Sequence, residues 1–257
     1  MRLLVKLGGT LLDADDSRLR LARELAAVSR LHALVVVHGG GKQMTRFLAE
    51  RGVESRFIDG LRVTTPETID AVLKVFAGSV NKQLVAAMVA AGVQAVGLSG
   101  IDACLVEAEP LRPELGQVGR PVRSNTGLLD CLTGAGYLPV VACVAGDRQG
   151  RIYNVNADQM AVACASGFHA DRLVFLTDVA GVLDAEKRLL PVLSLAQCGD
   201  LIRRGVATGG MQAKLTAASD ALSSGVPEVV IAPGGIENAL ARLLASEALG
   251  TRLVEEA

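Results

Sequence analysis

Residues 2–10 read RLLVKLGGT, an apolar run that a single lysine interrupts and a glycine pair ends. Residues 33–42 have the same form, with ALVVVH followed by GGGK. Further short apolar runs, rich in leucine or β-branched residues, lie at 94–99, 137–144, 172–177 and 227–232. Such runs are typical of strands in a parallel sheet, because both faces of that sheet are covered. The sequence therefore predicts strands at these positions, beginning with 2–7 and 33–38.

Segments with apolar residues three or four positions apart separate the strands and predict helices. These helices are expected at about 17–31, 41–51, 66–91, 125–136, 156–168, 209–224 and 236–246. Strand and helix alternating this often predict an α/β fold, an open and mainly parallel αβα sandwich. Proline, glycine and charged residues break the alternation at 103–123 and 147–153, where we expect β-hairpins.

Composition excludes several classes of protein. The 257 residues carry a net charge of −1 without a block of one sign, so we expect no nucleic-acid partner. No uninterrupted apolar stretch reaches the length of about 18 residues that indicates a membrane span, and residues 1–7 do not resemble a secretory leader. The three histidines lack metal-ligand spacing, so no protein-bound metal is expected. We therefore expect a cytoplasmic protein.

The cysteines support the same compartment. None of them forms a CxxC pair, and they predict reduced, buried thiols. They are Cys104, Cys131, Cys143, Cys164 and Cys198.

Three glycine-rich turns follow predicted strands, at the end where open α/β sheets bind ligands. They read KLGGT (6–10), HGGGK (38–42) and APGG (232–235). Glycine lets the backbone approach a ligand, and a helix that starts after the turn offers N–H groups to anions. Glycine also serves simply to make tight turns, so the pattern leaves both roles open. GxxxxGK[ST] and GxGxxG are absent, so a phosphate site here works without a Walker lysine.

Two lysines stand where local structure does not favour a charge. Lys6 interrupts an apolar strand, which is costly unless the ammonium faces a polar site or reaches solvent from an edge strand. Lys214 lies near the start of a predicted helix, where a cation opposes the helix dipole. A bound phosphoryl group would favour the positive charge of both lysines. In YNVNADQ (153–159), Asn156 and Asp158 suit helix capping as well as a ligand site.

Motifs from end to end resemble the amino-acid kinase family, and within it the members that phosphorylate N-acetyl-L-glutamate. In chain order they are KLGGTLL, VVVHGGGK, IDGLRVT, GSVNKQL, GLSGIDA, GYLPVVA, YNVNADQ, LTDVAGVL and GGMQAKL. The resemblance implies one domain over 1–257, with an N-acetylglutamate-binding lobe (1–155) and an ATP-binding lobe (156–257). It also implies transfer of the γ-phosphoryl group of ATP to the side-chain carboxylate, in arginine biosynthesis. Mg²⁺ would be held mainly by the ATP phosphates.

Roles pass by resemblance to the matching residues. Lys6 and Lys214 would stabilise the transferring phosphoryl group, and Asp158 would orient both lysines. Residues that would bind the amino-acid substrate are Gly39, Gly40, Arg62 at its α-carboxylate and Asn154 at its acetylated end. Residues that would bind the nucleotide, the first two through N–H groups beside the transferring group, are Gly8, Gly9, Asp178, Gly181 and Thr208.

The chain departs from the family pattern in two ways. GLSGIDA has Ile101 and Ala103 where members commonly carry lysine and glycine, which leaves the exact acyl-amino acid open. Hexameric, arginine-inhibited members carry a helix before the first strand, and here the first strand-like run begins at Arg2. We therefore expect a homodimer that is insensitive to arginine.

Two alternatives stay open. A sister kinase that acts on carrier-bound 2-aminoadipate or glutamate typically reads NTDGDQ where this chain reads NVNADQ. A non-catalytic amino-acid-binding regulatory module could keep Arg62 and Asn154, but would have no reason to retain Lys6, Asp158 and Lys214 together.

Overall fold

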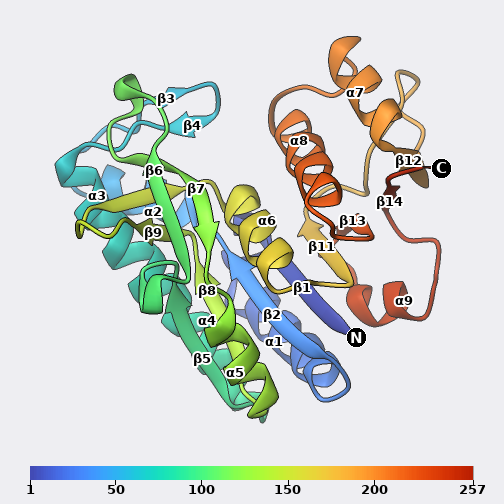
Figure 1. Ribbon diagram of the computed structural model, residues 1–257, viewed down its shortest axis with the longest axis horizontal. Helices are drawn as coiled ribbons and strands as arrows, with labels where there is room; N and C mark the ends of the chain where they lie inside the picture. The colour runs from blue at the N-terminus through green and yellow to red at the C-terminus, as the bar shows by residue number, and fades with distance from the viewer. Residues whose placement is uncertain (257) are drawn as a thin grey trace.

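The apolar run at the start of the chain forms the central strand of an eight-stranded sheet. The structure, a computed structural model, describes residues 1–256 (Figure 1). In chain order the strands of this sheet are β1 (Arg2–Leu7), β2 (Ala33–His38), β5 (Ala95–Ser99), β8 (Leu138–Ala142), β11 (Arg172–Thr177), β12 (Val192–Ser194), β13 (Val229–Pro233) and β14 (Thr251–Val254). They lie side by side in the order β12-β14-β13-β11-β1-β2-β8-β5. Only β13 and β14 pair antiparallel, so the carboxyl ends of β1, β2, β8 and β11 lie at one edge.

Two layers of helices cover the sheet. The helices are α1 (Asp15–Ser29), α2 (Gly41–Ala49), α3 (Pro66–Val72), α4 (Asn81–Ala90), α5 (Gly127–Gly134), α6 (Ala157–Gly167), α7 (Leu195–Arg203), α8 (Gly209–Ser223) and α9 (Ala239–Leu244). On one face α1 contacts α4 and α9. On the other, α5 covers β2 and β8, α6 lies across β1, β2 and β11, and α8 packs along α6 (Figure 1). The predicted αβα sandwich is confirmed; α7, β12 and β14 are additions to the predicted elements.

The segments that break the alternation form smaller β structures. Strands β6 (Val106–Pro110), β7 (Val118–Ser124), β9 (Val144–Gly146) and β10 (Ile152–Val155) join in one four-stranded unit. Both predicted hairpins are present in it, as β6 with β7 and β9 with β10, and a parallel pairing of β10 with β7 links them. A separate hairpin pairs β3 (Phe57–Ile58) with β4 (Leu61–Arg62). Short 3₁₀ turns are η1 (Gly9–Leu12), η3 (Asp102–Cys104) and η4 (Pro113–Leu115).

One long helical run connects α3 to α4 through the π-helical segment η2 (Leu73–Val80). Within residues 1–256 this run, Pro66–Ala90, is the one helix long and apolar enough to cross a membrane by length and composition. Several of its apolar side chains enter the core, where Val72, Leu84 and Met88 are fully buried, whereas Val89 is exposed. Packing in the core therefore accounts for much of its apolar composition, which Lys74, Asn81 and Lys82 interrupt.

The prediction of buried cysteines is wrong for two of the five. All five thiols are free, but Cys104 and Cys131 are exposed. Cys104 lies in the η3 turn, and Cys131 lies on the side of α5 opposite the buried Leu129. The apolar residues next to these two cysteines in the sequence therefore did not indicate whether the cysteine side chain faces the core. Burial raises the pKa of the remaining thiols, to about 12 for Cys143 and Cys164 and about 11 for Cys198.

The backbone of Gly250, directly before β14, passes close to β13, and this close packing generates a stability prediction. Gly250 has φ of +79°, and a Cβ there would overlap the carbonyl oxygen of Ile231. We expect Gly250→Ala to lower the free energy of unfolding by about 2–4 kcal/mol, from the left-handed backbone and the overlap. Gly134→Ala is the matched control, since no atom lies within 4 Å of its Cβ position. Urea denaturation of both variants checks this, and a Gly250→Ala protein as stable as wild type would contradict it.

Candidate active site

A buried lysine on the central strand defines the site. Lys6 lies between its neighbours Val37 on β2 and Phe175 on β11, and only 7% of it is exposed. Its Nζ lies 2.6 Å from Oδ1 of Asp158, in the first turn of α6. Because α6 crosses β1, this carboxylate neutralises a charge that would otherwise be unpaired inside the sheet.

A second lysine shares the same carboxylate. Lys214, on α8, places its Nζ 3.6 Å from Oδ2 of Asp158. Burial raises the pKa of the Asp158 carboxyl, but the ammonium groups of Lys6 and Lys214 outweigh burial and hold that pKa below its usual range. Asp158 is therefore ionised at neutral pH. Two ammonium groups and one carboxylate leave one net positive charge, which favours an anionic ligand.

Capping and ion pairing fall to different residues of the same turn. Asn156 is the N-cap of α6, and its Oδ1 accepts the N–H groups of Asp158 at 2.8 Å and Gln159 at 3.3 Å. This confirms the capping role expected for Asn156. It also frees the Asp158 side chain to face the lysines.

A cavity of about 170 Å³ adjoins the start of α6. Its walls come from the turn after β2, the β3–β4 hairpin, β10 and the N-terminus of α6. All four residues expected at the amino-acid substrate line this cavity: Gly39, Gly40, Arg62 and Asn154. The structure therefore brings together residues more than 100 positions apart in the sequence.

Arg62 is fixed in the cavity wall with its charge uncompensated. Its guanidinium donates to the hydroxyl of Ser55, to the Gly41 carbonyl at 3.1 Å and to Thr45 Oγ1 at 2.8 Å. It also lies over the Phe57 ring, with Cζ 4.7 Å from the ring centre. Within residues 1–256 it forms no ion pair, and burial lowers its pKa. A planar cation held in this way suits a substrate carboxylate.

Hydroxyl groups hold the residues that are expected to bind the amino-acid substrate, and the sequence did not predict these hydroxyls. Asn154 Nδ2 donates to Oγ1 of Thr64 at 3.0 Å, and Thr64 is fully buried. Ser55 and Thr45 support Arg62 in the same way. Thr64 lies inside the motif IDGLRVT, which could have indicated it, but nothing in the sequence distinguishes Ser55 or Thr45.

The glycine turns after β1 and β2 abut each other. Gln43 Nε2 donates to the Gly9 carbonyl at 3.3 Å, and a Cβ on Gly9 would lie 3.4 Å from the Gly41 nitrogen. The expectation for Gly8 needs correction, because its N–H donates to the Leu176 carbonyl at 2.9 Å. The backbone of β11 therefore occupies the Gly8 N–H that was expected to face the transferring group.

Within the described residues, no hydrogen bond or ion pair joins the other residues expected at the nucleotide to the lysines. Asp178 is exposed just after β11, and its Oδ1 accepts from Thr177 Oγ1 at 3.1 Å. Gly181 is buried, and a Cβ on it would lie 2.7 Å from Thr251 Oγ1. Thr208 is the N-cap residue of α8, the helix that carries Lys214.

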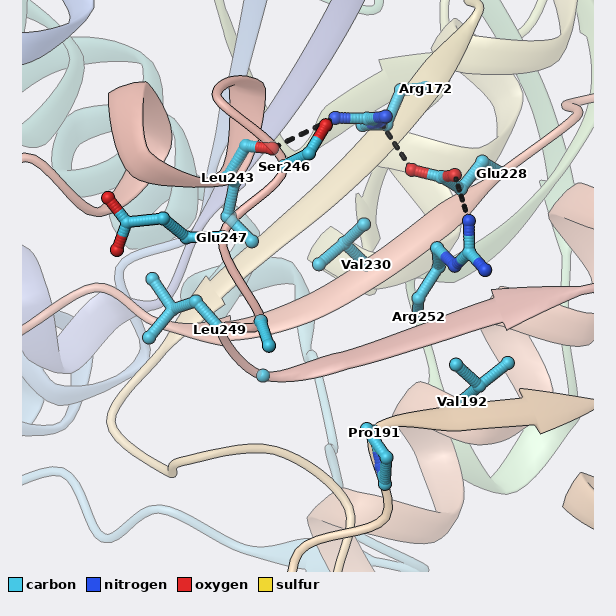
Figure 2. Close-up of a pocket in the computed structure, with 12 residues that line it drawn as sticks. Arg172, Pro191, Val192, Glu228, Val230, Leu243, Ser246, Glu247, Leu249 and Arg252 are labelled. Atoms are coloured by element: carbon cyan, nitrogen blue, oxygen red, sulfur yellow. Dashed lines mark hydrogen bonds and ion pairs between the residues drawn. The ribbon is translucent and has the colours of Figure 1, made fainter.

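Two further cavities have different walls. One of about 540 Å³ shares Gly41, Phe57 and Arg62 with the cavity of about 170 Å³. The other, of about 330 Å³, lies at the opposite end of the sheet, where β11 begins (Figure 2). There Glu228 pairs with Arg172 at 2.5 Å and with Arg252 at 3.6 Å. None of the residues expected at the site lines that third cavity.

The chain belongs to the amino acid kinase family, whose sequence model matches residues 1–233. It is similar to the acetylglutamate kinase of Solibacter usitatus, with 64% identity over 255 residues that cover 99% of each chain. The acetylglutamate kinase of Deinococcus radiodurans is 46% identical, over 98% of this chain and 100% of its own. Among solved structures, the N-acetylglutamate synthase from Neisseria gonorrhoeae, complexed with coenzyme A and N-acetyl-glutamate, superposes with a TM-score of 0.89 and 26% identity. The match covers all of this chain and 60% of the synthase chain.

The shared carboxylate generates a pH-dependent stability prediction. Asp158→Asn leaves two ammonium groups without a counter-charge, so we expect it to lower the free energy of unfolding by about 3 kcal/mol at pH 7. The folded-state pKa of Asp158 lies below the ordinary value of about 3.9, so its stabilisation is present above that value and is lost as pH falls through the folded pKa. The difference between wild type and variant should therefore shrink below about pH 4.

Urea denaturation between pH 7 and pH 3 measures this difference. Asp200→Asn is the control, because Asp200 pairs with Arg204 at the surface and should contribute less than about 1 kcal/mol. A difference for Asp158→Asn that stays constant with pH would show that the carboxylate charge is not what stabilises the fold.

Proposed function

We propose that this protein transfers the γ-phosphoryl group of ATP to the side-chain carboxylate of N-acetyl-L-glutamate. The observation that carries the proposal is one buried carboxylate, Asp158, between the ammonium groups of Lys6 and Lys214. Support for the substrate comes from the acetylglutamate kinases that match the whole chain, and from the cavity that holds Arg62 and Asn154.

The reaction makes modest chemical demands. The substrate carboxylate is ionised at neutral pH and needs no general base. One of its oxygens forms a bond to the γ-phosphorus, the bond from that phosphorus to the bridging oxygen of the β-phosphate breaks, and ADP leaves. What the protein has to supply is alignment and stabilisation of the charge on the transferring group. Lys6 and Lys214 would supply that stabilisation, with Asp158 fixing their direction.

Recognition of the amino-acid substrate would fall to the cavity walls. Arg62 would bind the α-carboxylate with two parallel hydrogen bonds, and Asn154 would bind the acetylated end. The two departures from the family pattern, Ile101 and Ala103, lie outside this cavity. Ala103 has φ of +50°, so the backbone keeps a conformation that favours the glycine common in the family. These departures therefore leave the cavity itself intact.

We further propose that Mg²⁺ arrives with ATP, bound mainly by its phosphates. Residues 1–256 contain no group of three or more His, Cys, Asp or Glu side chains that could hold a metal. The acyl-amino acid would bind to lobe 1–155 and ATP to lobe 156–257.

We further propose that the protein is a cytoplasmic homodimer that acts in arginine biosynthesis. The outer edge of β5 pairs with no strand of residues 1–256, and Leu31 and Val89 expose apolar surface. Sedimentation equilibrium tests the dimer, and a monomer mass would refute it.

A substrate panel tests the proposed activity. ATP turnover is measured with N-acetyl-L-glutamate, with 2-aminoadipate and without acceptor, and the acyl phosphate is trapped as its hydroxamate. Turnover and hydroxamate with N-acetyl-L-glutamate alone are expected. Turnover with 2-aminoadipate instead would support the sister kinase, and no turnover at all would support a binding module.

The lysine pair generates a kinetic prediction. We expect Lys6→Ala and Lys214→Ala each to lower kcat by about 10²–10³-fold, comparable to the loss of one transition-state donor. Arg62→Ala should mainly raise KM for N-acetyl-L-glutamate, because it removes binding that substrate and transition state share. Lys74→Ala is the control, since Lys74 pairs with Asp70 on the surface. An unchanged kcat for Lys214→Ala would refute the two-lysine scheme.

A further inference from the structure

A buried polar network lies behind the glycine turn of the substrate cavity, and no step above uses it. His38 is the last residue of β2, directly before Gly39, and has no exposed surface. Asn81, the first residue of α4, is 1% exposed. Its Nδ2 lies 3.0 Å from Nε2 of His38 and 2.9 Å from the Val140 carbonyl oxygen. Buried polar side chains joined in this way fix one geometry.

The neighbours of Asn81 determine where the imidazole proton lies. The Val140 carbonyl can only accept, and the Lys82 ammonium, 3.2 Å from Oδ1 of Asn81, can only donate. The Asn81 amide therefore points its NH₂ group at Val140 and at His38. Nε2 of His38 accepts that second N–H, so the proton of the neutral ring is on Nδ1. Nδ1 lies 2.9 Å from the Gly39 carbonyl oxygen, which accepts a hydrogen bond from the Nδ1–H group.

The direction of one backbone N–H follows from this tautomer. The Gly39 carbonyl and the Gly40 N–H belong to one planar trans peptide and point in opposite directions. A hydrogen bond that draws the carbonyl toward His38 therefore turns the Gly40 N–H away from it. Gly40 lines the substrate cavity, and its N–H has no hydrogen-bond partner within residues 1–256.

The π-helical segment η2 packs against the same turn. A Cβ on Gly40 would lie 2.9 Å from Phe76 and 3.3 Å from Val80, so these side chains touch the Gly40 backbone. The residue after Val80 is Asn81. One helical run thus holds the turn by close packing and, through Asn81 and His38, by hydrogen bonds. π-helical turns inside α-helices occur frequently at functional sites.

We propose that His38 and Asn81 are positioning residues that hold the Gly39–Gly40 peptide so that the Gly40 N–H faces the reacting groups. The inference rests on the proposed function, since it assigns that N–H a role in phosphoryl transfer. Burial lowers the pKa of His38 to about 4, which agrees with a neutral ring at pH 7.

The tautomer is measurable without any activity. The protein has three histidines, so ¹⁵N spectra of the imidazoles at pH 7 are simple, and His32→Gln and His169→Asn assign the His38 signals by elimination. We expect a neutral ring with the proton on Nδ1. A proton on Nε2 would overturn the proposal whether or not the protein turns over N-acetyl-L-glutamate. Asn81→Asp removes the side-chain N–H that Nε2 accepts, so it should change the ¹⁵N signals of the His38 ring.

A matched pair of variants tests the consequence for catalysis. Asn at position 38 can present an amide N–H near the place of Nδ1, whereas Gln reaches the place of Nε2. His38→Asn therefore keeps the bond to Gly39, and His38→Gln keeps the bond to Asn81. We expect His38→Gln to lower kcat by about 10²-fold, as a misplaced catalytic group does, and His38→Asn to lower it by less than about tenfold.

Urea denaturation of both variants separates positioning from folding. Equal losses of kcat, or losses that follow the free energies of unfolding, would mean that His38 has only a structural role. If neither variant folds, the tautomer of the wild-type protein still decides. A wild type that fails the substrate panel but shows the Nδ1 proton would contradict the proposed function and leave the hydrogen-bond network established.

Discussion

The ion pair between Lys6 and Asp158 is the constraint on which the rest of the site depends. A lysine in the middle of a buried strand is tolerated only where a carboxylate meets it. That requirement fixes the first turn of α6 over β1, with Asn156 satisfying the helix N–H groups. Because α8 packs along α6, Lys214 then reaches the same carboxylate from a distant part of the sequence. The sheet order, one helix start and one helix–helix contact together produce a site with a net positive charge.

Much of the fold could be predicted from the sequence, because buried strands and amphipathic helices differ in period. The predicted strands and helices are all present, with ends shifted by up to a few residues. The missed elements are the β3–β4 hairpin, with two residues in each strand, and α7, β12 and β14 in the last third of the chain. β12 has only three residues and β14 only four, so neither forms a long apolar run. For α7 a signal existed, since Ser194 and Gln197 form a capping box at its start.

The site was predictable in its charges but not in its supports. Lys6 and Lys214 were identifiable because a charge at each position is unfavourable in its local structure. Such a charge is stabilised by a partner from elsewhere in the fold. The hydroxyls of Ser55, Thr45 and Thr64 are not unfavourable in their local sequence, so nothing in that sequence indicates a special role. The N–H groups of the glycine turns are equally hidden, because every residue except proline carries one. Only the structure shows that the Gly8 N–H is occupied by Leu176.

Strand β1 has hydrogen-bonded neighbours on both sides, β2 from the first half of the chain and β11 from the second. The two halves are therefore mechanically continuous and cannot swing about a flexible connection in the manner of two domains on a linker. A movement of the backbone that changes the 3.6 Å between Lys214 and Asp158 has to be taken up by twisting the sheet or sliding α8 along α6. The central strand thus joins the two halves of the sheet and limits how far the backbones that carry Lys6 and Lys214 can move apart.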